Sequence, residues 1–155
     1  MYQVEVKRWL VHYLYPRRDG WRVLVHVDPM ELGERRDQPE TKRVRARIAV
    51  KALRSLGASI GRHAELGPAD IVAEHPKHGV VVIEVEGESR VQKQQALYSA
   101  FGQLAIQMNG GARKYVIAFP DDPKWARQAI KITPYTRRKL NLSCLLVSAT
   151  GVREG

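Results

Sequence analysis

Two apolar runs at the start of the chain, YQVEVKRWLVHYLY and WRVLVHV, lie on either side of the turn-forming stretch PRRDG. In the first run Val4 and Val6 alternate with polar residues, and after a slip near Lys7 the alternation resumes on the other parity. Alternation with a period of two around a Pro/Gly turn is typical of a β-hairpin. We therefore predict a β-hairpin extension over residues 1–29. The alternative is a first helix that ends at Gly20.

Residues 30–41 mix proline, glycine and charged residues, which predicts a linker. Residues 42–56 have a helical period, which predicts a helix with Thr41 at its N-cap and Gly57 just beyond its end. The apolar stripe of this helix consists of Val44, Ile48, Ala52 and Leu56, with Ala49 and Leu53 beside it. A second stripe is basic and consists of Arg43, Arg47, Lys51 and Arg54. The basic stripe is either a solvated helix face or a nucleic-acid-binding surface that contacts phosphates.

Beyond this helix, strand-like apolar runs alternate with helical patterns. The predicted strands are residues 58–66, 69–75, 79–87, 114–119 and 140–148. The predicted helices are residues 90–108 and 121–132. Three strands in succession followed by alternating helices and strands predict an α/β fold, in which helices cover both faces of a mixed sheet. We assign this core domain to residues 42–155.

The charge of the chain points to a polyanionic partner. Lys and Arg number 26 against 16 Asp and Glu, which gives a net charge of +10. Such a surplus concentrates polyanions near the surface, and nucleic acid is the main candidate because binding its phosphates releases counterions. The alternatives are a ribosome-associated protein, a protein that binds acidic membranes, and a charge that serves solubility alone.

Cysteine usage and hydropathy add two expectations. Cys144 is the only cysteine, so no internal disulfide can form and we expect a reducing, cytoplasmic location. No stretch approaches the roughly 20 apolar residues that a membrane span requires. We therefore expect no membrane partner.

Three carboxylates lie close together in the predicted strands. Glu84 and Glu86 share one face of the most apolar strand, and Asp70 opens the preceding strand. If the hairpin between these strands closes on Lys77-His78, Asp70 lies opposite residue 85 and diagonal to both glutamates. Crowded carboxylates repel one another, and a hard divalent cation makes such a cluster tolerable. The alternative is a solvated strand face whose glutamates pair with Lys or Arg.

These residues resemble the restriction-endonuclease-like superfamily, the PD-(D/E)XK nucleases. The family pattern is an Asp before a hairpin, then an acidic residue, any residue and Lys in the next strand, and then a helix that often carries a Gln. Here Pro68-Ala69-Asp70 approximates the first part, and Glu84 matches the acidic position. Glu86 falls where the family has Lys. The resemblance covers roughly residues 42–149 and implies a restriction-endonuclease-like fold.

The resemblance also implies the chemistry of the site. Asp70 and Glu84 would hold Mg²⁺ or Mn²⁺, together with the backbone carbonyl of Val85. The metal would polarise the scissile phosphate and activate a water molecule for hydrolysis. Glu86 would act as a general base on that water or bind a second metal ion.

Two further residues are candidates through the same resemblance. The missing Lys can be supplied by the next helix in some families, and Lys93 is the local candidate. Gln103, within Gly102-Gln103-Leu104, falls at the position of the family Gln and would face the substrate backbone. The alternative for both residues is an exposed polar face.

The sequence therefore predicts a Mg²⁺-dependent endonuclease that hydrolyses phosphodiester bonds of DNA. We expect a homodimer, because enzymes that cut two strands are often two-fold symmetric and the aromatic hairpin could supply the interface. One alternative is a catalytically inactive nucleic-acid-binding module of the same fold, which the missing Lys would permit. The other is an RNA nuclease.

Overall fold

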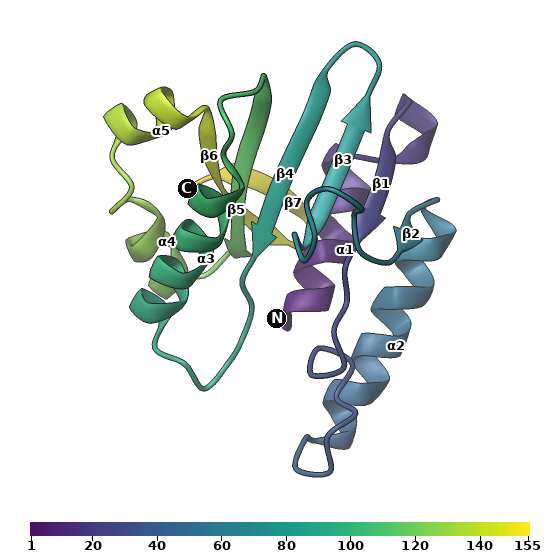
Figure 1. Cartoon of the computed structure of the whole chain (residues 1–155). Coiled ribbons are helices and arrows are strands. Elements are labelled where there is room, and N and C mark those ends of the chain that lie inside the picture. The colour runs from purple at the N-terminus through teal and green to yellow at the C-terminus, as the bar shows by residue number, and fades with distance from the viewer.

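The computed structural model describes residues 1–155 as an α/β protein built on one seven-stranded sheet (Figure 1). The strands, in chain order, are β1 (Arg22–Val25), β2 (Ser59–Ile60), β3 (Ile71–His75), β4 (Gly79–Val85), β5 (Arg113–Pro120), β6 (Leu142–Ser148) and β7 (Gly151–Glu154). The helices are α1 (Gln3–Leu14), α2 (Glu40–Ser55), α3 (Lys93–Gln107), α4 (Pro123–Ala129) and α5 (Pro134–Leu140), with a 3₁₀ turn at Arg17–Asp19.

The sheet is mixed, with the strand order β2-β1-β3-β4-β5-β6-β7. Strands β1, β3 and β4 form an antiparallel meander, and β4, β5 and β6 are parallel. Helix α3 makes the crossover from β4 to β5. The central strand β4 is buried on both faces, which explains why its sequence reads as a nearly continuous apolar run.

Helices cover both faces of the sheet, as predicted. Helices α1 and α2 pack on one face and share a cluster of 19 buried apolar residues with it. Helices α3 and α4 pack on the other face, in a cluster of 17. Successive residues of β4 contribute to alternate clusters, with Ile83 and Val85 on the α1–α2 face and Val82 on the α3 face. Glu84 therefore belongs to the α3 face.

The predicted N-terminal hairpin is wrong, and the alternative of a first helix is closer to the structure. The first run forms α1, which buries Val4, Lys7 and Val11 together with Val6 and Leu10. Spacings of three and four among these residues put them on one side of a helix. Val4 and Val6 have the two-residue spacing of a strand because both residues lie on the broad buried face of α1.

The N-terminal segment is also no separate extension. Val4 of α1 and Val23 of β1 belong to the same buried cluster as Ile71 and Ile83 of the hairpin. Of the aromatic side chains in this segment, Trp9 and Trp21 pack against this cluster, whereas Tyr13 is 38% exposed. The homodimer stays a prediction.

Helix α2 exists where predicted, but its buried face is shifted. Gly57 follows it with φ +86°, which confirms the predicted glycine beyond its end. The predicted N-cap is wrong, because the helix begins at Glu40 and Pro39 is its N-cap. Its buried residues are Ala46, Ala49 and Leu53, whereas Val44 and Ile48 are 47% and 54% exposed. The N-terminal half of the predicted stripe thus points outward, and the residues predicted beside it pack inward.

The remaining differences lie in the strands and at the C-terminus. The strand predicted for residues 58–66 is reduced to β2, and the third strand of the meander is β1. The segment after β5 contains a second short helix, α5, and β6 turns back into β7. The hairpin of β3 and β4 and helix α3 lie where they were predicted.

Candidate functional site

The β3–β4 hairpin brings Asp70 and Glu84 to the same end of the sheet. His75 pairs with Gly79 and Ile71 pairs with Ile83, so the turn contains three residues, 76–78. We predicted a two-residue turn that would place Asp70 opposite Val85. The observed register, continued by one residue, places Asp70 opposite Glu84, and directly opposed residues share one face of a sheet.

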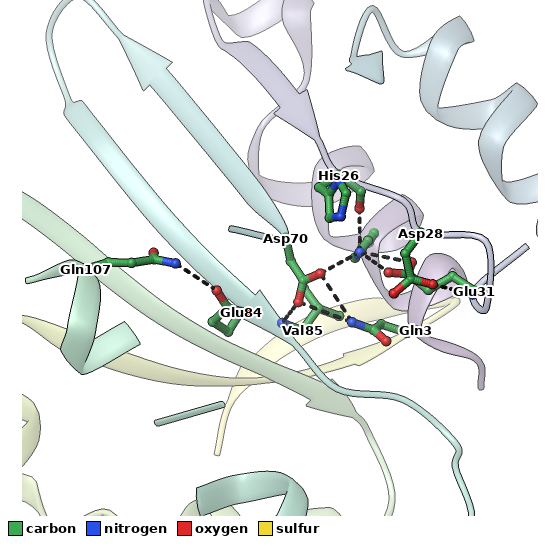
Figure 2. A network of polar contacts seen from close by, with 9 residues as sticks. Gln3, His26, Asp28, Glu31, Asp70, Glu84, Val85 and Gln107 are labelled. Atoms are coloured by element: carbon green, nitrogen blue, oxygen red, sulfur yellow. Dashed lines mark hydrogen bonds and ion pairs between the residues drawn. The ribbon is translucent and has the colours of Figure 1, made fainter. Parts of the chain in front are cut away.

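Asp70 has hydrogen-bonding partners on several sides (Figure 2). It is 7% exposed, and its Oδ2 accepts a hydrogen bond of 2.8 Å from the backbone N–H of Val85. The Gln3 side-chain amide donates to both carboxylate oxygens at 3.2 Å. The Lys7 ammonium lies 2.7 Å from Oδ1. Asp70 therefore ties the end of β4 to the first turns of α1.

Lys7 is fully buried and has an acceptor for each of its three protons. Its ammonium donates to the backbone carbonyl of His26 at 2.6 Å, to Glu31 at 2.7 Å, and pairs with Asp70. Burial lowers the pKa of Lys7, but the charges of Asp70 and Glu31 more than offset this, and the pKa is raised. Lys7 is therefore a permanent cation between two buried carboxylates.

Glu84 is more buried than Asp70 and has no cationic partner within ion-pair distance. It is 3% exposed, and its only side-chain hydrogen bond to a neutral group comes from the Gln107 amide, at 3.4 Å (Figure 2). Burial raises the pKa of Glu84 to about 9, helped by the charge of Asp70. The surroundings of Glu84 therefore disfavour its ionised form in the absence of a cation.

Glu86 lies two residues further along and is half-buried. Its carboxylate forms no hydrogen bond or ion pair, and burial, followed by the charge of Asp70, raises its pKa to about 7. The next residue, Gly87, is required by packing. A Cβ there would collide with the backbone of Gln3, so only glycine lets the end of β4 lie against the first turn of α1.

The site therefore carries more buried negative charge than positive charge. Lys7 is the only ammonium among four carboxyls, those of Glu31, Asp70, Glu84 and Glu86. Burial also raises the pKa of Glu31, to about 7, against the opposing charge of Lys7. Uncompensated carboxylates in a low-dielectric site take up protons or bind a cation.

Asp70 and Glu84 are the groups that could hold a hard cation. No cluster of three or more His, Cys, Asp or Glu side chains has the geometry of a metal site. Magnesium ions commonly use only one or two carboxylates, with water and phosphate oxygens completing the shell. The Gln107 amide turns its nitrogen toward Glu84, and its Oε1 is buried without a hydrogen-bonding partner. The two carboxyls thus fit a divalent cation whose remaining ligands are water and phosphate oxygens.

The other predicted site residues lie elsewhere. Lys93 sits over the ring of Trp125, 4.7 Å from its centroid, and 3.7 Å from Glu88, and it pairs with none of the site carboxylates. Gln103 is exposed and donates to Ser99 on the same helix at 3.2 Å.

The basic stripe of α2 lies on the opposite side of the sheet from α3. Arg47, Lys51 and Arg54 are exposed there, whereas Arg43 is half-buried and donates to the Gly33 carbonyl at 3.4 Å. Three of the four side chains are therefore free to contact a polyanion.

Sequence reasoning missed three residues that contact the carboxylates: Gln3, Lys7 and Gln107. Gln107 could have been found, because it follows Gln103 by four residues and so shares its stripe of α3. Lys7 stands at the slip in the alternation of the first run, where a helical reading would have placed it between buried valines. Nothing in the local sequence indicates that Gln3 reaches Asp70.

Comparisons with protein-family models, with curated proteins and with solved structures find no match to this chain. Among the helices of the structure, none has the length and apolar character needed to cross a bilayer. What the site can do must therefore be argued from its geometry and its charge.

Proposed function

We propose that this protein is a metal-dependent nuclease of the restriction-endonuclease-like type that hydrolyses phosphodiester bonds of DNA. One observation carries the proposal: the β3–β4 register places Asp70 opposite Glu84 at one end of the sheet, where both are buried and Lys7 is the only cation that pairs with either of them. Folding two carboxyls together in this way is unfavourable unless a cation joins them. A site that retains such a pair is built for a ligand with positive charge.

Asp70 and Glu84 would hold the cation. Magnesium or manganese bound there supplies positive charge against a scissile phosphate and promotes ionisation of a water molecule. Glu86 would accept the proton of the attacking water, since its carboxylate has no other partner and burial raises its pKa to about 7. A base with a pKa near the working pH is suited to that role.

Lys7 supports the proposal by supplying the cation that the local motif lacks. Glu86 stands where the resemblance leads one to expect Lys, and the buried ammonium of Lys7 reaches Asp70 from α1 instead. It fixes one oxygen of Asp70, and its charge lowers the pKa of both Glu84 and Glu86 against the effect of burial. Lys7 thus acts as a positioning residue for the carboxylates.

Nucleic acid as the substrate is supported by the charge of the molecule. The net charge is +10 although the site itself is acidic, so the basic side chains are concentrated outside it. Phosphates attracted to the basic surface would raise the local concentration of nucleic acid around the protein, and a cation bound at the acidic site would contact them. Exposed basic residues on α2, such as Arg47 and Lys51, belong to this surface.

Plasmid cleavage with added Mg²⁺ or Mn²⁺ tests the proposal. We expect the wild-type protein to nick or linearise plasmid, and Asp70→Asn and Glu84→Gln each to reduce the rate by about 100-fold or more. Glu34→Gln is the matched control, because Glu34 is exposed and its side chain has no partner. Cleavage that survives both site substitutions would refute the proposal.

A second candidate is a nucleic-acid-binding module without catalytic activity. It is favoured by the ion pair between Lys7 and Asp70, which already neutralises one presumed ligand, and by the absence of a three-residue metal cluster. In that case DNA would bind with the salt dependence of phosphate contacts but remain intact with every divalent cation. Binding of labelled DNA measured beside the cleavage assay separates the two functions.

A further inference from the structure

A hollow of about 570 Å³ lies beside the carboxylates on the α3 face of the sheet. One wall is the segment Glu65–Pro68, which precedes Asp70, and the other is the C-terminal part of α3 with the residues that follow it. The volume falls within the roughly 300–1000 Å³ of pockets that enclose small organic ligands. Gln107 belongs to its lining and donates to Glu84 (Figure 2), so this side chain connects the hollow to the buried carboxylates.

The lining is rich in carboxamides. Gln103, Gln107 and Asn109 all face the hollow. A carboxamide offers both a donor and an acceptor, which matches the edges of nucleobases. One of these groups has unused capacity, since Asn109 uses only its oxygen, toward the N–H of Gly111. Glu65 adds an acceptor suited to an exocyclic amino group.

Two side chains of opposite character complete the hollow. Arg113 has no ion-pair partner and no side-chain hydrogen bond, so its guanidinium is available for a phosphate. Ile106 is 86% exposed, the most exposed large apolar side chain of the molecule. An apolar side chain held at the rim of a polar pocket is suited to fill the gap that a displaced base leaves in a stack.

The carboxamides line a concavity, and this decides what can reach them. Readout of a continuous duplex requires a protruding helix or strand that enters a groove, because the base edges are recessed. Here the polar groups line a hollow instead, and Gln103 and Asn109 are exposed within it. A base that has left its stack can enter the hollow and contact both, as in enzymes that act on unpaired or extruded nucleotides.

We propose that this hollow binds one unstacked nucleobase of the substrate, so that the preferred DNA contains an unpaired nucleotide next to the scissile phosphate. Gln103 and Asn109 contact the base edge, Arg113 contacts the neighbouring phosphate, and Ile106 takes the place of the base in the stack. This inference deepens the proposed nuclease function and depends on it for the position of the scissile phosphate. It makes a separate claim about binding, which can be measured without cleavage.

The test measures the affinity of the full chain for three labelled DNAs of one sequence, in EDTA so that no cleavage occurs. The probes are a single strand, a fully paired duplex and a duplex with one bulged nucleotide. We expect the bulged duplex to bind at least about fivefold more tightly than the paired one, which is the lower limit for one stacked or specifically contacted base. Equal affinities for the two duplexes would overturn the inference.

Substitutions in the hollow then locate the preference. Ile106→Ser, and Gln103→Ala combined with Asn109→Ala, should bring the affinity ratio of bulged to paired duplex close to one and leave the affinity for paired duplex unchanged. These side chains are exposed, so the variants should fold, as circular dichroism can verify. Ile130→Ser and Gln95→Ala are matched controls, because both are exposed residues outside the hollow. A preference that survives in the hollow variants would place base recognition elsewhere.

The outcomes distinguish the two claims. A preference for the bulged duplex that depends on the hollow, without cleavage under any divalent cation, would refute the nuclease but retain the base-binding hollow. Cleavage that depends on Asp70 and Glu84, with no preference among the probes, would retain the nuclease and refute the hollow.

Discussion

The two sides of the site treat buried charge in opposite ways. On the α1 side, the Lys7 ammonium is matched by Asp70 and Glu31, and Gln3 completes the hydrogen bonds of Asp70. On the α3 side, Glu84 and Glu86 have no cation, and Gln107 contributes one long hydrogen bond. The first arrangement is what structural ion pairs require, whereas the second keeps carboxyls buried at a cost in stability.

This difference indicates that the two sides have different roles. The α1 side holds the end of β4, the start of β3 and the first helix in a fixed relation, so it belongs to the architecture. The α3 side leaves its carboxyls dependent on protons, which is a common state of sites that await a ligand. Asp70 stands between the two and is shared by both. The following predictions are ordered by the size of the effect that each side should produce.

Removing the cation of the α1 side should have the largest effect. Lys7→Met leaves Asp70 and Glu31 buried without their counter-charge, and we expect it to lower the free energy of unfolding by about 3–5 kcal/mol. Urea denaturation at neutral pH measures this. The exposed residue Lys51 provides the control, since Lys51→Met should change stability by no more than about 0.5 kcal/mol.

The charge-balance explanation has a further consequence for the same position. Combining Lys7→Met with Glu31→Gln and Asp70→Asn removes all three charges together, and we expect it to recover a large part of the lost stability. If the triple variant were as unstable as Lys7→Met alone, the loss would come from packing of the lysine stem and the contrast between the two sides would fail.

Removing a charge from the α3 side should raise the free energy of unfolding, whereas Lys7→Met lowers it. The pKa of Glu84 is about 9 in the folded protein against an ordinary 4.5, so the folded state binds the extra proton between these values. With Glu84 protonated in both states below about pH 4.5, the free energy of unfolding is at its full value there. It falls as the pH rises toward 9, because the buried carboxyl must then ionise or keep its proton at a cost. Glu84→Gln mimics the protonated form and keeps a donor for Asp70.

We therefore expect Glu84→Gln to stabilise the metal-free protein at about pH 8, by on the order of 2 kcal/mol, and to have little effect at about pH 5. Thermal unfolding at the two pH values measures the difference. Glu34→Gln is again the control, since an exposed glutamate should show no such pH dependence. A destabilising effect of Glu84→Gln at both pH values would show that the buried carboxylate has a structural partner.

How much of this could be read from the sequence depends on how local the cause is. The β3–β4 hairpin was predictable because two apolar runs flank a turn, and Glu84 lies in β4 as predicted, whereas Glu86 lies just beyond its end. The register was wrong by one position, because turn length is decided by the conformation of residues 76–78 and not by their polarity. That single position separates a diagonal Asp70 from one directly opposite Glu84.

The α1 side could not be predicted for a different reason. A helical reading of the first run requires a lysine on the buried face, which is unfavourable for any helix taken alone. Lys7 is tolerated there only because two carboxylates come from distant segments: Glu31 lies 24 residues away in the chain and Asp70 lies 63 residues away. The same tertiary contacts decide that Val44 and Ile48 stay exposed on α2 while the alanines pack inward.

The smallest effect, and the most direct test of the α3 side, is stabilisation by a divalent cation. A ligand that binds only the folded state raises the free energy of unfolding by about 1.4 kcal/mol at roughly tenfold excess over its Kd. We expect Mn²⁺ to raise the melting temperature of the wild-type protein at about pH 8, less so at about pH 5, where protons compete for Glu84 and Glu86. Glu84→Gln should abolish the increase, and Glu34→Gln should retain it. Because the α1 side already holds a cation of its own, Lys7 and Mn²⁺ would then neutralise different carboxyls of one cluster. If Mn²⁺ still raised the melting temperature of Glu84→Gln, the metal would bind elsewhere.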